Sequence, residues 1–114
     1  MSYLQFLIML RSLCTVDEFS GTCAKGFLVD GHELFVVHKG GEFFAYRNSC
    51  PHLGISLEFN KDAFLDTDRR LIQCSSHGAL FEIGSGLCVS GPCLGQALKP
   101  LKLELKQGHL YCEL

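Results

Sequence analysis

The chain has 114 residues, of which 47% are hydrophobic and 19% are charged. This length and composition suit one globular domain with a substantial core, and they argue against an intrinsically disordered chain. The 10 basic and 12 acidic residues give a net charge of -2, with no basic stripe of the kind that nucleic-acid-binding proteins carry. We therefore expect a single domain over residues 1–114 that binds no nucleic acid.

The cysteines and the N-terminal segment bear on the cellular compartment. Seven cysteines are an odd number, which does not suit a full set of intrachain disulfides. The apolar run over residues 3–10 has no basic residue ahead of it, has no small-residue cleavage site after Arg11 and is too short to span a bilayer. We interpret it as a first buried strand. The protein is therefore expected to be cytoplasmic, off the membrane and with reduced cysteines.

The first half of the chain predicts an antiparallel meander. Residues 26–29, 33–38 and 42–46 are short runs rich in β-branched and aromatic residues, which favour strands. Asp30 and Gly31 form a typical two-residue hairpin turn, and the glycines at 40 and 41 turn the chain again. No helical periodicity of useful length interrupts this pattern.

The second half continues with short strands separated by turns. Residues 66–70 form a polar hairpin tip, and Gly91 with Pro92 marks a tight loop. Strict alternation of apolar and polar residues predicts a half-buried strand over residues 101–106. Further strands are expected at 79–83, 87–89 and 109–112. Turn signals that recur at this spacing indicate an all-β domain of about eight to ten strands.

Two short motifs pair a cysteine with a histidine. Cys50 and His52 are separated by one residue, Cys74 and His77 by two, and a glycine closely follows each pair. Thiolate and imidazole ligands suit zinc or an iron–sulfur cluster, whereas hard cations prefer oxygen. The four residues therefore predict one metal site built from two loops. A structural zinc site would use the same ligand types, but its pairs usually belong to a hairpin-and-helix unit, and no helix is evident.

The two motifs, together with the Gly91 and Pro92 loop, resemble those of the small soluble Rieske-type ferredoxins. The similarity extends from about Leu13 to Tyr111. It implies a three-sheet antiparallel β-sandwich with a cluster-binding tip. Two ligand loops, at about residues 47–56 and 73–80, would form this tip, and a third loop at about 88–95 would cover it.

The resemblance also implies a [2Fe-2S] cluster and its ligands. Cys50 and Cys74 would bind one iron as thiolates, and His52 and His77 would bind the other iron through ring nitrogens, close to the surface. Neutral imidazoles leave their iron less negative than thiolates would, which raises the reduction potential above that of an all-cysteine cluster.

The chain departs from the high-potential Rieske subunits of respiratory complexes at four positions. Ile55 and Ser76 replace the two cysteines that form a disulfide between the loops there. Ala79 and Phe81 replace a serine and a tyrosine whose hydroxyls donate hydrogen bonds to the cluster or its ligand. Fewer such donors stabilise the reduced state less, so we expect a potential nearer about −150 mV than about +300 mV.

The predicted function is one-electron transfer rather than catalysis. The sequence has no nucleophile elbow, phosphate-binding glycine loop or paired catalytic carboxylates. By resemblance, a flavin-dependent reductase would supply the electron and a terminal oxygenase or similar enzyme would receive it; we expect a monomeric carrier. The alternative is a small electron-entry or accessory subunit of a larger reductase, of the nitrite-reductase small-subunit type.

The other cysteines and histidines receive less specific interpretations. Cys88 and Cys93 flank the Gly91 and Pro92 loop, where they could form a disulfide or lie beside the cluster; we favour two buried, reduced thiols. Leu53 is a candidate for an exposed apolar contact with a redox partner. The remaining residues of these types are interpreted as core or surface residues and not as ligands: Cys14, Cys23, Cys112, His32, His38 and His109.

Overall fold

The structure, a computed structural model, describes residues 10–51, 54–58 and 60–114. These residues form ten strands and one short 3-10 helix, η1 (Val16–Glu18), which bears out the prediction of an all-β domain. The strands are β1 (Leu10–Thr15), β2 (Cys23–Val29), β3 (His32–Lys39), β4 (Glu42–Arg47), β5 (Leu71–Gln73), β6 (Leu80–Glu82), β7 (Cys88–Ser90), β8 (Pro100–Leu101), β9 (Leu103–Lys106) and β10 (His109–Glu113).

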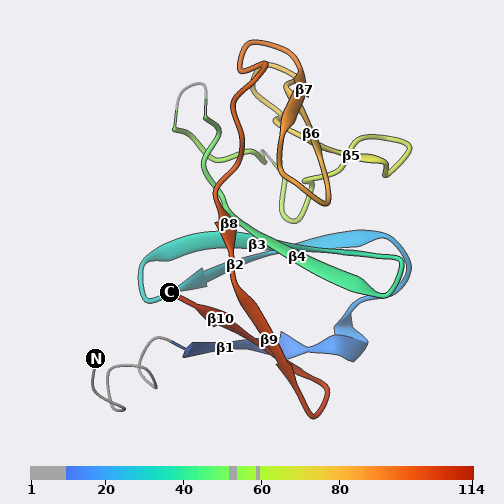
Figure 1. Ribbon diagram of the computed structural model, residues 1–114, viewed down its shortest axis with the longest axis vertical. Coiled ribbons are helices and arrows are strands. Elements are labelled where there is room, and N and C mark those ends of the chain that lie inside the picture. Colours follow the sequence, from blue (N-terminus) through green and yellow to red (C-terminus); the bar gives the residue numbers. More distant parts are fainter. Residues whose placement is uncertain (1–9, 52–53, 59) are drawn as a thin grey trace.

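The strands form three antiparallel sheets, as the family resemblance implied. Their orders are β1-β10-β9, β2-β3-β4-β8 and β5-β6-β7. The first two sheets lie together in the lower part of Figure 1, and we call them the base. The third sheet and the loops around it form a separate upper lobe, which we call the tip (Figure 1).

Strand β3 lies between the two hydrophobic clusters of the molecule. Its side chains alternate between opposite faces of the sheet, as they do in any strand. Leu34 and Val36 pack against the cluster that includes the β10 residues, while Phe35 and Val37 pack against the cluster that reaches into the tip. All four side chains are fully buried. Burial on both faces explains why this segment is apolar almost throughout.

Two tight hairpins have the turn residues that their geometry needs. Asp30 and Gly31 join β2 to β3 with φ values of 50° and 81°, and Gln107 and Gly108 join β9 to β10 with φ values of 51° and 76°. Positive φ at both central residues is the type I′ arrangement, whose twist matches that of the flanking strands. The predicted hairpin at Asp30 is therefore confirmed.

The predicted strand over residues 101–106 is divided between two sheets. Pro100–Leu101 (β8) pairs with β4 in the larger base sheet, whereas Leu103–Lys106 (β9) pairs with β10. The chain passes from one sheet to the other at Lys102. Apolar and polar residues alternate without a break through this change, so the pattern could not reveal it. Strand β9 also differs from the predicted half-buried strand, because Leu105 is 57% exposed.

The first described strand extends beyond the segment that was predicted as a strand. Leu10–Thr15 (β1) pairs with β10 along its length. Of the predicted strand at residues 3–10, only Leu10 falls within the described residues. The sequence analysis assigns no strand to residues 11–15, because Arg11, Ser12 and Thr15 give this segment little apolar character. Pairing with a central strand compensates for that composition.

Tyr46 joins the tip to the base. Its hydroxyl donates a hydrogen bond to the carbonyl oxygen of Ile83, just after β6, and burial raises its pKa to about 12. The aromatic ring lies against Gly86, where a Cβ atom would approach a ring carbon to 2.7 Å. The turn after β6 therefore needs a residue without a side chain at this position.

The loop that follows β7 packs directly on the second predicted ligand loop. A Cβ atom at Gly91 would lie 2.8 Å from the Cα atom of Ala79, and Gly91 has a φ of 103°. Ala79 is fully buried and its carbonyl oxygen is hydrogen-bonded, so it cannot move aside cheaply. The predicted covering loop is therefore in close contact with the loop that contains Cys74.

We expect Gly91→Ala to destabilise the protein by about 1–3 kcal/mol more than Gly95→Ala does, because overpacking a close contact costs free energy. Gly95 is a matched control: its φ of 88° imposes a similar backbone strain, while a Cβ atom added there would meet no atom within 4 Å beyond its chain neighbours. Thermal unfolding of the two purified variants measures the difference. Equal destabilisation would show that the covering loop is not held against Ala79.

Candidate metal centre

The first predicted ligand loop follows β4 and is a closed turn. The Cys50 N–H donates to the Ile55 carbonyl oxygen at 2.8 Å, and the Gly54 N–H donates to the Cys50 carbonyl oxygen at 2.7 Å. Gly54 has a φ of 71°, which a residue with a side chain rarely adopts. The turn buries Cys50, which is only 1% exposed.

The second predicted ligand loop, between β5 and β6, repeats this arrangement. The Cys74 N–H donates to the Ala79 carbonyl oxygen and the Gly78 N–H to the Cys74 carbonyl oxygen, both at 2.9 Å. Gly78 has a φ of 70°, and Cys74 is fully buried. In both loops the cysteine therefore begins a turn that a glycine closes four residues later.

The two loops are connected through Leu57. The Ser75 N–H, directly after Cys74, donates to the Leu57 carbonyl oxygen at 2.7 Å, and Leu57 follows the first loop. His77 is exposed at the second turn. His52 and Leu53 lie outside the described residues. Within the described part of the chain, no three metal-ligating side chains gather closely enough to hold a metal ion by themselves.

The donor set fits an iron–sulfur cluster better than a hard cation. Two buried thiols come from matching turns, and an exposed imidazole stands on one of them, so soft and borderline ligands predominate. Ala79 and Phe81 are fully buried at or just after the second loop, and neither side chain can donate a hydrogen bond to sulfur. Ile55 is 41% exposed, which places an apolar side chain at the surface of the first loop.

Cys88 and Cys93 form a buried pair at the covering loop. The Cys93 thiol donates to the Cys88 sulfur over 3.1 Å, and no disulfide forms among the described residues, which include all seven cysteines. Burial raises the pKa of Cys93 to about 12, with smaller contributions from Cys88 and from the nearby charge of Cys50. The structure therefore agrees with the prediction of two buried, reduced cysteines and places Cys93 close to the first ligand loop.

The other histidines belong to the base. His38 on β3 contacts the Gly21 carbonyl oxygen through Nδ1 at 2.6 Å, and His109 on β10 contacts the Ser12 hydroxyl through Nε2 at 2.7 Å. His32 lies at the start of β3 beside Arg47. Their positions on base strands agree with the interpretation of these histidines as core or surface residues.

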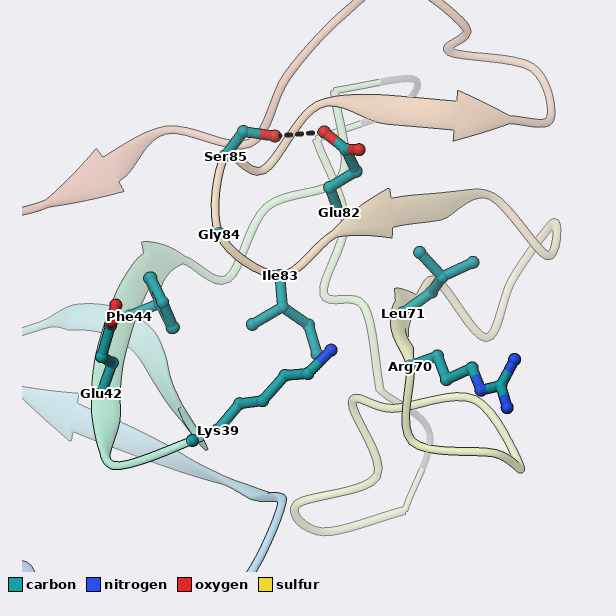
Figure 2. Close-up of a pocket in the computed structure, with 10 residues that line it drawn as sticks. Lys39, Glu42, Phe44, Arg70, Leu71, Glu82, Ile83, Gly84 and Ser85 are labelled. Atoms are coloured by element: carbon teal, nitrogen blue, oxygen red, sulfur yellow. Dashed lines mark hydrogen bonds between the residues drawn. The ribbon is translucent and has the colours of Figure 1, made fainter.

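A groove of about 610 Å³ lies between the β3–β4 turn and the end of β6. Figure 2 shows Lys39 reaching toward Ile83 across this groove, with the Ser85 hydroxyl bonded to Glu82 on its far side. Lys39 and Arg70 contribute positive charge, while Glu42 and Glu82 contribute negative charge. The groove contains none of the predicted ligands, and its mixed charges select no particular class of small molecule.

Asn48 is a residue of the site that the sequence analysis did not single out. It lies two residues before Cys50 and is the one buried polar side chain among the residues that the structure describes. Its amide oxygen accepts a hydrogen bond from the Leu57 N–H at 2.8 Å. A polar residue just before a loop is ordinarily exposed, so composition alone carried no signal of its burial.

Comparisons with known proteins support the assignment of the fold and the family. The chain is 31% identical to ferredoxin CarAc of Metapseudomonas resinovorans over 104 residues, covering 91% of this chain and 92% of the relative. It is 34% identical to the ferredoxin component of the p-cumate 2,3-dioxygenase system of Pseudomonas putida over 105 residues, covering 91% of this chain and 85% of the relative.

Within the described ranges, no helix is long and apolar enough to cross a bilayer.

Solved structures show the same fold. A chain in a complex of reduced oxygenase and oxidized ferredoxin in carbazole 1,9a-dioxygenase superimposes with a TM-score of 0.76 at 24% identity, covering 92% of this chain and 93% of that one. The ferredoxin of carbazole 1,9a-dioxygenase from Nocardioides aromaticivorans IC177 superimposes with a TM-score of 0.75 at 21% identity, covering 92% of this chain and 97% of that one.

The profile of the Rieske [2Fe-2S] domain matches residues 10–108, and the chain therefore belongs to the Rieske [2Fe-2S] domain family.

Proposed function

We propose that this protein is a one-electron carrier, the ferredoxin component of a multicomponent oxygenase system. The observation that carries the proposal is the pair of matching turns that bury Cys50 and Cys74 in a Rieske domain. The curated relatives described above are ferredoxins, and one is the ferredoxin component of a dioxygenase system. A carrier of this kind supplies electrons to an enzyme and is not itself the catalyst.

We propose that Cys50 and Cys74 hold one iron of the [2Fe-2S] cluster as thiolates and that His52 and His77 hold the other. When bound, such a cluster accepts and returns one electron. The two turns keep both sulfurs away from water, and the second turn presents His77 at the surface. An exposed ligand on one side offers electrons a short path to a docked protein.

The partners follow from the same proposal. A flavin-dependent reductase would donate the electron, and a terminal oxygenase would accept it. Both relatives described above are ferredoxins, so a carrier is favoured over a small subunit of a nitrite-reductase type. We further propose a monomeric cytoplasmic protein whose single domain covers residues 1–114, with ligand loops at about 47–56 and 73–80 and a covering loop at about 88–95.

The ligand assignment predicts different effects for two histidine substitutions. We expect His77→Ala to lose most of its iron and acid-labile sulfide, because it removes one of the four ligands. His109→Ala should retain both, since His109 contacts Ser12 in the base. Iron and sulfide analysis of the two purified variants, with electron paramagnetic resonance of the dithionite-reduced proteins, measures the outcome.

The spectrum of the unsubstituted protein is the reference for this comparison. Mixed cysteine and histidine ligation should give a lower average g value than an all-cysteine cluster. Full iron in both variants would refute the assignment of His77. A colourless protein that contains zinc and no sulfide would refute the cluster itself.

We expect the reduction potential to lie near the low end of the Rieske range, at about −150 mV. Ala79 and Phe81 are buried at positions where hydroxyl donors would stabilise the reduced state, and neither can donate. Redox titration followed by visible absorbance measures the potential. A positive midpoint would contradict the prediction, and Phe81→Tyr should raise the potential if the missing hydroxyl is the cause.

A further inference from the structure

We propose that Asn48 is a positioning residue that sets the relative placement of the two ligand loops. The inference rests on the proposed function, because it concerns the spacing of Cys50 and Cys74 as ligands of one cluster. Asn48 is not a ligand itself. It acts through a short series of hydrogen bonds that connects the start of the first loop to the second.

The Asn48 side chain uses both ends of its amide. Its Oδ1 accepts the Leu57 N–H at 2.8 Å, and its Nδ2 donates to Glu58 Oε1 at 2.9 Å. Its backbone N–H donates to the Glu33 carbonyl oxygen on β3 at 3.0 Å. With 7% exposure, this residue is held in a position where water cannot easily replace its partners.

Leu57 extends the connection to the second loop. Its N–H is bound by Asn48, and its carbonyl oxygen accepts the Ser75 N–H at 2.7 Å. Asn48 lies two residues before Cys50, and Ser75 lies directly after Cys74. Two hydrogen bonds in series, through the backbone of one residue, therefore join the two cysteine-bearing turns. The Leu57 side chain is fully buried, so this residue cannot shift without disturbing the core.

Glu58 fixes the orientation of the amide. An ionised carboxylate only accepts hydrogen bonds, so the NH₂ end of Asn48 must face Glu58 and the oxygen must face Leu57. The other Glu58 oxygen, Oε2, accepts the Asp62 N–H at 3.0 Å. Asp62 Oδ1 in turn accepts the Gly26 N–H of β2 at 2.7 Å. The base sheet thereby anchors the group that orients Asn48.

An exchange of amide and carboxylate tests this network. Asn48→Asp keeps an acceptor for Leu57 but places a second carboxylate against Glu58. Glu58→Gln replaces one carboxylate oxygen with an NH₂ group. The side chain at position 58 then lacks an acceptor for one of its two donors, the Asn48 NH₂ group or the Asp62 N–H.

The double variant, Asn48→Asp with Glu58→Gln, makes the carboxylate and the amide change places. The new carboxylate at position 48 accepts from the Leu57 N–H and from the NH₂ group at position 58. The amide oxygen at position 58 accepts from the Asp62 N–H. All three hydrogen bonds are thereby restored, and the pair again holds one ionisable carboxylate.

We expect each single variant to lose iron to a chelator at least about fivefold faster than the unsubstituted protein, since misplaced turns hold the cluster less well. The g values of the reduced protein should also change in each single variant. The double variant should return both properties close to the original. Cluster-loss rates, g values and the reduction potential are measured on cluster-containing protein at one temperature.

Tyr46→Phe is the matched control for a purely structural effect. It removes another buried hydrogen bond, which joins Tyr46 of the base to the Ile83 carbonyl oxygen of the tip and does not connect the two loops. We expect this variant to unfold at a lower temperature with unchanged g values. If the Asn48 and Glu58 variants behave in the same way, with altered stability alone, the positioning role is wrong.

The outcomes separate this inference from the proposed function. Unsubstituted protein without a [2Fe-2S] cluster would refute the proposed function. Unsubstituted protein with a full cluster, together with single variants that match it in cluster-loss rate and g values, would refute only the role of Asn48. A double variant no better than the worse single variant would also refute it.

Discussion

The site depends on a repeated turn that buries a cysteine at its start. In each turn, the backbone of the cysteine makes two hydrogen bonds, and a glycine with positive φ closes the ring. The N–H and the carbonyl oxygen of each cysteine are both paired within its turn, so the cysteine can be buried without leaving its own backbone groups unpaired. The three sheets support this arrangement: β4 and β5 lead into the two turns, and the loop after β7 lies over the second.

The base and the tip depend on each other through few but specific contacts. Strand β3 contributes alternate residues to the two hydrophobic clusters, so both clusters depend on it. The Tyr46 hydroxyl and the backbone N–H of Asn48, which donates to the Glu33 carbonyl oxygen, then add directional bonds between the halves. Apolar packing gives the tip its stability, whereas these polar contacts decide where its loops lie, because hydrogen bonds constrain geometry more narrowly than dispersion does.

Much of this fold was predictable from local signals. The turn chemistry of Asp30 and Gly31, the apolar run in β3 and the cysteine–histidine motifs each depend on residues close in sequence. The exchange of sheets at Lys102 was not predictable, because both strand segments have the same alternation. The Asn48 network was missed for a different reason: its side-chain partners lie 9 and 10 residues further along the chain, and burial of a loop asparagine follows only from the tertiary arrangement.

The position of the C-terminus has a practical consequence. Leu114 packs against the cluster within the base, and Figure 1 shows that end of the chain well away from the tip. A linker attached there leads away from the predicted ligand loops. Tethering the protein to an electrode or to a reductase through this end would leave the loops turned outward, so heterogeneous electron transfer could be studied in one defined orientation.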